Sequence, residues 1–172
     1  MTLWNPERSV IASARAYRRY MDRCGPLAKM LRKLTRLRHG FWSAITGSTI
    51  IPGVRLGERL RLPHPIGVVI HKDAVNGDDC MTMQQVTIGQ LSEPGAATLG
   101  RGVYVGAGAR ILGDVAIGDH ARIGANAVVL TDVPAYHTTV GVPAELRSRS
   151  SPDEIERFRS EPVEAGDQRI RR

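Results

Sequence analysis

Aliphatic residues recur every six positions between residues 99 and 130. The series consists of Leu99, Val105, Ile111, Ile117, Ile123 and Val129. Four positions after each of them stands a small or β-branched residue, namely Val103, Ala109, Val115, Ala121, Ala127 and Val133. A period of six matches neither an amphipathic helix nor an alternating strand. It indicates a parallel β-helix, in which stacked coils bury the aliphatic residues of their neighbours.

The same rhythm begins earlier, at Ile50, shifts by two residues after Leu62 and resumes at Ile70. Asn76 and Thr82 stand where aliphatic residues are expected, so these coils are less regular. Residues 90–98 break the period and predict a short loop that leaves the coil.

The pattern decays after Val129, and the chain becomes polar from Arg147 onward. We therefore expect a β-helix domain over residues 49–146 and a polar, mobile tail over residues 147–172. Ser151 to Glu154 have the spacing of a capping box, which favours a short helix there.

Residues 1–48 form a different, basic segment. Three- and four-residue spacings predict helix over residues 9–39, interrupted at Gly25-Pro26, with Pro26 suited to a first helical position. His39 and Gly40 suit the helix end, and residues 41–49 then link to the first coil. One apolar face of this helix carries Leu27, Met30, Leu31, Leu34 and Leu37.

The charge of the chain is concentrated in this segment. Residues 1–48 carry ten Lys and Arg against two acidic residues, whereas the other 124 residues have a net charge of −1. A basic amphipathic helix can make peripheral contact with an anionic membrane surface or bind an acidic partner. Alternatively, its apolar face packs on the base of the β-helix and its charges are solvated. Nucleic-acid binding is not expected, because no recognisable nucleic-acid-binding fold accompanies the arginines.

The cysteines and the apolar runs of the sequence indicate the cellular compartment. Cys24 and Cys80 make neither a disulfide framework nor a zinc site, which favours a reducing, cytoplasmic location. The basic helix adds the membrane surface as a place where the cytoplasmic protein can lie. No apolar run approaches 18 residues, and the N-terminus lacks the apolar core of a secretory signal.

Histidines are the main candidates for chemistry. His64 stands between Pro63 and Pro65 where the rhythm shifts, and a rigidly held imidazole there suits a general base. The other four have structural alternatives: a helix end for His39, a corner for His71, an outward position for His120 and the exit segment for His137. No metal is expected, because a zinc site needs several histidines at coil spacing.

Several segments together resemble the serine acetyltransferase branch of the hexapeptide acyltransferases: LRLPHPIGVVIHKDAV, QQVTIG, VYVGAGARILGDVAIGDHARIGANAVVLTDVP and HTTVGVPA. The resemblance implies a left-handed parallel β-helix, so we expect a mainly β fold with the short N-terminal helical segment described above. It also implies a homotrimer with sites between subunits and acetyl transfer from acetyl-CoA to a hydroxyl.

On this resemblance His64 matches the catalytic histidine. Gly89, Ala107 and Ala125 match positions along which CoA lies, although plain coil geometry explains these small residues as well. Charge alone suggests Arg110, Arg122 and Arg147 for the CoA phosphates.

Three departures fall on the acceptor side. Thr49 and Pro63 replace aspartates of the family, and the loop with Pro94-Gly95-Ala96 lacks its second histidine. Because an amino-acid acceptor needs charged partners, we expect a saccharide acceptor in surface polysaccharide synthesis. The alternatives are serine O-acetyltransferase in cysteine biosynthesis and a non-catalytic β-helix scaffold. The zinc-dependent carbonic anhydrases that share this fold need a histidine triplet that this chain lacks.

Overall fold

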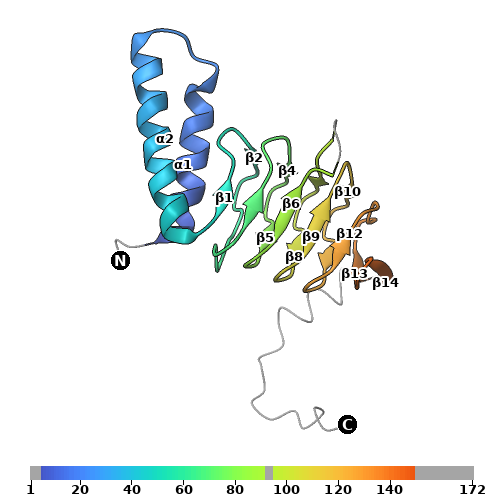
Figure 1. The fold of residues 1–172 in the computed structure, drawn as a ribbon. Helices are drawn as coiled ribbons and strands as arrows, with labels where there is room; N and C mark the ends of the chain where they lie inside the picture. The colour runs from blue at the N-terminus through green and yellow to red at the C-terminus, as the bar shows by residue number, and fades with distance from the viewer. Residues whose placement is uncertain (1–4, 92–94, 150–172) are drawn as a thin grey trace.

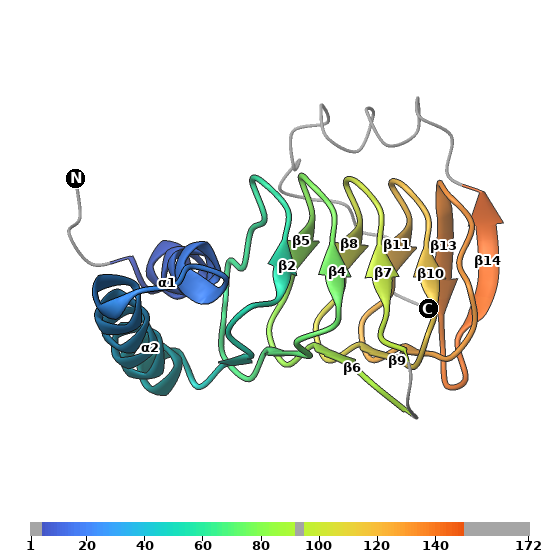
Figure 2. The ribbon, with the colours of Figure 1, turned by 90° about the horizontal axis from the view of Figure 1, so that it is seen from above.

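Two helices stand at one end of a three-sided β-helix in the computed structural model, which describes residues 5–91 and 95–149 (Figures 1 and 2). Helix α1 spans Pro6–Met21 and helix α2 spans Pro26–Thr46. The side chain of Asn5 caps α1 by accepting a hydrogen bond from the Arg8 backbone N–H over 3.0 Å. The predicted break at Gly25-Pro26 is confirmed, with Pro26 opening α2. No helix among the described residues is long and apolar enough to cross a membrane.

Short strands form the three sides, and all of their pairings are parallel except that of β14 with β13. Sheet I contains β1 (Thr49–Ile50), β3 (Val69–Ile70), β6 (Thr87–Gly89), β9 (Arg110–Leu112) and β12 (Val128–Val129). Sheet II contains β2 (Arg55–Leu56), β4 (Val75–Asn76), β7 (Thr98–Leu99) and β10 (Ala116–Ile117). Sheet III contains β5 (Met81–Thr82), β8 (Tyr104–Val105), β11 (Arg122–Ile123), β13 (His137–Val140) and β14 (Glu145–Arg149). The chain visits the three sheets in rotation, so the parallel β-helix expected from the sequence is confirmed.

The six-residue rhythm places one residue of each strand inside the coil. Ile50, Ile70, Ile88, Ile111 and Val129 stack on one another along sheet I and are essentially inaccessible to solvent. Every coil buries its aliphatic residue against those above and below, which is how a solenoid acquires a continuous core. Asn76 and Thr82 occupy the corresponding inner positions of sheets II and III, as their place in the pattern indicates.

Helix α1 closes the base of the solenoid. Its Val10, Ile11 and Ala14 are buried in the same core as the first coils. Glu7 accepts a hydrogen bond from the Leu62 backbone N–H over 2.9 Å, and Arg18 donates to the Gly53 carbonyl over 2.6 Å. The helix is therefore joined to the β-helix by apolar packing and by polar contacts.

The expected helix end at His39-Gly40 is wrong. Helix α2 continues through residues 41–46 and ends at Gly47, whose left-handed φ of 60° terminates it. His39 lies inside the helix, 4% exposed, with Nδ1 2.9 Å from Ser13 Oγ and Nε2 donating to the Ile50 carbonyl over 2.6 Å. It ties both helices to β1, a partnership that no local pattern reveals.

The apolar face of α2 does not pack on the β-helix. Leu27, Met30, Leu34 and Leu37 are each at least 60% exposed. A different face, with Ala28, His39 and Thr46 buried, turns toward α1 and the first coil.

The C-terminal end of the solenoid also differs from expectation. Residues 145–149 form β14, which pairs antiparallel with β13, although the polar tail was expected to begin at Arg147. The expected helix near Ser151 lies outside the described residues. The predicted loop at residues 90–98 lies between β6 and β7, with residues 92–94 outside the described part.

Candidate functional site

His64 lies in the irregular turn that leads from sheet III to sheet I, between Arg61 and β3. Its side chain is exposed, and no residue in the described part of the chain hydrogen-bonds to its imidazole. Pro63 and Pro65 restrict the backbone on both sides, because a proline ring fixes φ. The result is an accessible imidazole on a stiff support.

Backbone hydrogen bonds stack the turns of this edge, which we call the III–I edge. Gln85 donates to Ile66 over 2.9 Å, and Gly108 donates to Gln84 over 2.9 Å. Asn126 then donates to Ala107 over 2.8 Å. The structure therefore brings Ala107 and Ala125 to the edge that carries His64.

The small side chains of these two alanines leave the backbone of the III–I edge accessible to a ligand. Ala107 is half-buried and Ala125 is exposed, so a ligand running along the III–I edge meets mainly backbone there. Small side chains are what close approach of a ligand to a backbone requires.

Gly89 lies elsewhere. It ends β6, in register with Leu112, at the border where sheet I turns toward sheet II. The structure does not bring Gly89 to the edge of His64, and it precedes the loop of residues 90–98 instead.

Gln84 is a polar group of the III–I edge that the sequence analysis did not single out. Its Oε1 is buried without a hydrogen-bond partner among the described residues. A buried acceptor without a partner calls for an explanation, such as a ligand or an ordered water. In the sequence, its signal is the pair of glutamines that opens the QQVTIG segment just before β6.

The III–I edge is poor in charge. Its turns, residues 63–67, 83–86, 105–109 and 123–127, contain no acidic residue. Thr49 stands in β1 in register with Val69 and is exposed. These turns therefore offer His64 no carboxylate.

Basic residues flank the edge on both sides. Arg110 projects from β9 of sheet I and is exposed, while Arg122 lies on β11 of sheet III with its guanidinium 5.5 Å from the Tyr104 ring centre. A hollow of about 700 Å³ lies over the outer side of sheet III and extends to the edge between sheets II and III, so that Arg59, Asp79 and Arg101 line it together with Arg61, Tyr104 and Arg122. Arg147 is on β14, the terminal strand of sheet III, whereas Arg110 and Arg122 lie on β9 and β11, the strands directly connected to the turns of Ala107 and Ala125.

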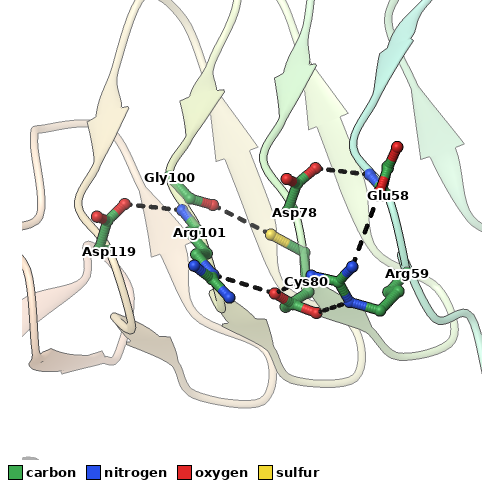
Figure 3. Close-up of polar contacts among 8 residues, drawn as sticks. Glu58, Arg59, Asp78, Cys80, Gly100, Arg101 and Asp119 are labelled. Carbon is green, nitrogen blue, oxygen red and sulfur yellow. Dashed lines mark hydrogen bonds and ion pairs between the residues drawn. The ribbon is translucent and has the colours of Figure 1, made fainter.

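Another edge, between sheets II and III, carries a chain of charges (Figure 3). Arg59 Nε donates to Asp79 over 2.5 Å, and Arg101 Nε donates to the same carboxylate over 3.0 Å. The hydrogen bond from Arg59, with help from Arg101, lowers the pKa of Asp79 to about 2. Asp78 and Asp119 accept backbone N–H groups of the preceding coil over 2.6 and 2.7 Å. This edge joins successive coils and serves a structural role.

The remaining histidines lie away from His64. His71 is 3.8 Å from Asp73 on a sheet I to sheet II turn, and His120 stacks on Tyr136 with ring centres 5.2 Å apart. His137 Nδ1 lies 2.9 Å from the Ala135 carbonyl. Among the described residues, no three His, Cys, Asp or Glu side chains are grouped to hold a metal ion.

Comparison with known proteins identifies the family. Residues 96–131 match the bacterial transferase hexapeptide (six repeats) family model. A serine acetyltransferase of Helicobacter pylori strain J99 is 42% identical over 122 residues, covering 69% of this chain and 67% of the relative. The serine acetyltransferase of Synechococcus elongatus is 41% identical over 134 residues, which are 76% of this chain and 52% of that protein. The chain thus spans about half to two thirds of the length of these curated relatives.

Solved structures agree. A Neisseria gonorrhoeae serine acetyltransferase, 35% identical, superposes with a TM-score of 0.74 over 98% of this chain and 60% of its own. A serine acetyltransferase in complex with CoA, 30% identical, gives a TM-score of 0.73 over 84% of this chain and 58% of its own. The chain belongs to the serine acetyltransferase family of hexapeptide-repeat proteins.

Proposed function

We propose that this chain is an acetyl-CoA-dependent O-acetyltransferase with His64 as its general base. The observation that carries the proposal is the III–I edge, where an accessible imidazole between two prolines shares one border with Ala107 and Ala125. Support comes from relatives that are named serine acetyltransferases and from a related structure in complex with CoA.

In the proposed reaction the His64 imidazole takes the proton of the acceptor hydroxyl as its oxygen attacks the thioester carbonyl. Collapse of the tetrahedral intermediate breaks the carbon–sulfur bond. The imidazolium of His64 then returns its proton to the leaving thiolate, so that the products are the acetyl ester and free CoA. A positioned general base contributes a factor of roughly 10²–10⁴ to the rate.

The acyl donor is proposed to lie along the III–I edge over Ala107 and Ala125. Arg110 and Arg122 supply positive charge on either side of this path, as the phosphates of CoA require. Gly89 stays a predicted contact, and its position beyond sheet I makes it suitable only for a distant part of the donor.

We further propose that the working form is a homotrimer with this edge covered by a neighbouring subunit. Ile66, two residues after His64, is 64% exposed, and Val69 on the outer side of sheet I is 36% exposed. Apolar side chains beside a polar site are typical of surfaces that a partner covers. The neighbour would also supply the polar groups that the turns of this edge lack.

The names of the relatives favour L-serine as the acceptor over the saccharide expected from the sequence. A sugar hydroxyl is the second candidate, and one observation favours it. The turns around His64 contain no carboxylate to pair with the ammonium group of an amino acid.

Thiol release from acetyl-CoA by the purified full chain tests the proposal. L-serine, nucleotide sugars and oligosaccharides are offered separately, with glycine as an amino acid without a hydroxyl. Release with L-serine alone supports the serine enzyme, and release with a sugar alone identifies a saccharide acetyltransferase. CoA binding without release for any acceptor would contradict the proposal and indicate a scaffold.

A further inference from the structure

Helix α2 exposes a continuous apolar stripe, which we call the α2 stripe. Its six members follow one another at spacings of three or four residues, so they lie on one side of the helix. They are Leu27, Met30, Leu34, Leu37, Phe41 and Ile45, with exposures of 63, 60, 61, 73, 56 and 45%.

The stripe is not the surface that holds α2 to the protein. Ala28, His39 and Thr46 are buried on another side of the helix, where His39 bonds Ser13 of α1 and Ile50 of β1. In Figures 1 and 2, α2 stands at the end of the molecule, with α1 beside it. The stripe is therefore left without a partner in the described part of this chain.

The charges around the stripe restrict what can cover it. Helix α2 carries Lys29, Arg32, Lys33, Arg36 and Arg38 and has no acidic residue. Lys33 follows Met30 and precedes Leu34, and Arg38 follows Leu37, so positive charge borders the apolar side chains. Among the described residues none of these five forms an ion pair with a carboxylate.

We propose that α2 is a membrane-surface helix, which lies along an anionic lipid bilayer with the α2 stripe among the acyl chains and the basic residues at the lipid headgroups. Large apolar side chains bordered by Lys and Arg are the features of helices that lie in the interface. A second copy of α2 is a less favourable partner for the α2 stripe than a lipid surface. Two such stripes in contact would bring ten positive charges together, and α2 has no acidic residue to compensate them. Anionic headgroups supply the opposite charge directly.

Co-sedimentation of the full chain with vesicles tests this inference. One set of vesicles is phosphatidylcholine alone, and the other contains phosphatidylglycerol and phosphatidylcholine in equal parts. The bound fraction is expected to be at least tenfold larger on the anionic vesicles at low salt and to fall as salt is raised. Equal binding to both sets, or no binding, would overturn the proposal.

Two variants separate the apolar and electrostatic contributions. Leu34→Ser with Leu37→Ser removes the middle of the stripe, and Lys29→Glu with Lys33→Glu reverses two of its bordering charges. All four side chains are exposed, so the fold is expected to survive, as far-UV circular dichroism checks. Each pair is expected to lower vesicle affinity at least tenfold.

The matched control is Arg55→Glu with Arg61→Glu, an equal charge reversal at exposed positions of the solenoid. Affinity for anionic vesicles should change less than threefold, and a tenfold fall would mean that net charge alone drives binding.

Sedimentation velocity, which measures the oligomeric mass, tests whether a second copy of α2 covers the stripe instead. A stripe variant that lowers the oligomeric mass while keeping its vesicle affinity would assign the stripe to a second copy and refute the lipid interface.

Discussion

Asn76 lies in register with Leu99 inside the β-helix, yet neither its amide nitrogen nor its amide oxygen has a hydrogen-bond partner in the described structure. The residue is 2% exposed and sits between Leu56 and Leu99 of the adjacent coils. A buried polar group without a partner costs about 1–3 kcal/mol.

Replacing this amide by an aliphatic side chain should therefore stabilise the protein. We expect Asn76→Leu to raise the free energy of unfolding by about 1–3 kcal/mol, measured by urea denaturation. The reverse change on the next coil, Leu99→Asn, should lower it. If Asn76→Leu and Asn76→Val were both less stable than the wild type, the amide would have a partner, such as a buried water.

Replacing His39 by an aliphatic residue should destabilise the protein, in contrast to the same change at Asn76. Its ring nitrogens join Ser13 to the Ile50 carbonyl over 2.9 and 2.6 Å inside the protein. His39→Leu should lower the free energy of unfolding by about 1–3 kcal/mol, because the buried Ile50 carbonyl loses its donor and Ser13 keeps only its hydrogen bond to the Val10 carbonyl. His71→Leu, at a less buried turn, is the control and should have a much smaller effect in the same urea titration.

Asp79 predicts a pH dependence at the edge between sheets II and III. Its pKa of about 2 in the folded protein lies below the usual value of 3.8, because Arg59 and Arg101 favour the carboxylate. The ionised group therefore contributes stability that is fully present above about pH 4 and is lost as the pH falls toward 2.

Unfolding of the wild type and of Asp79→Asn should be compared between pH 6 and pH 2. The wild type should be slightly more stable at pH 6, and the difference should vanish near pH 2. Asp22→Asn, at the exposed end of α1, is the control. If the difference in unfolding free energy between the wild type and Asp79→Asn persisted unchanged at pH 2, the ion pairs of Asp79 could not be its source.

Gly77 stands where two neighbouring coils approach each other closely. A Cβ at this position would collide with the Gly100 carbonyl, which is backbone and cannot move aside cheaply. Gly77→Ala should cost about 1–3 kcal/mol or more in the free energy of unfolding. Gly40→Ala, in open space on α2, should be neutral or stabilising by up to about 1 kcal/mol. Similar effects at both positions would refute the close approach.

The solenoid was predictable because its cause is local. Within each regular run an inner position recurs every six residues, so the stacked pairs Ile70–Ile88 and Ile111–Val129, each 18 residues apart, can be recognised without coordinates. Even the exceptions, Asn76 and Thr82, stand in the pattern at the inner positions where the structure places them.

The helix end and β14 were not predictable in this way. His39 prefers the middle of a helix here because Ser13 and Ile50 satisfy its ring, and those partners come from tertiary packing. Strand β14 has the polar sequence ELRSR, which carries no apolar signature and forms by adding to the exposed edge of β13.

The candidate site was predictable in part. The two prolines around His64 and the small residues Ala107 and Ala125 can be read from the sequence, and the coil stacking brings them to one edge. The separate position of Gly89 and the buried Gln84 oxygen depend on which border of a sheet each residue occupies.

The most direct test of the account is the thiol-release rate of His64→Ala with acetyl-CoA and the acceptor that the wild type uses. The kcat of His64→Ala should fall at least about a hundredfold, since a positioned general base contributes a factor of roughly 10²–10⁴ to the rate. The variant should keep the circular dichroism spectrum and oligomeric mass of the wild type, and His120→Ala should keep most of the activity. Near-normal turnover of a folded His64→Ala variant would contradict the assignment of His64 as the base.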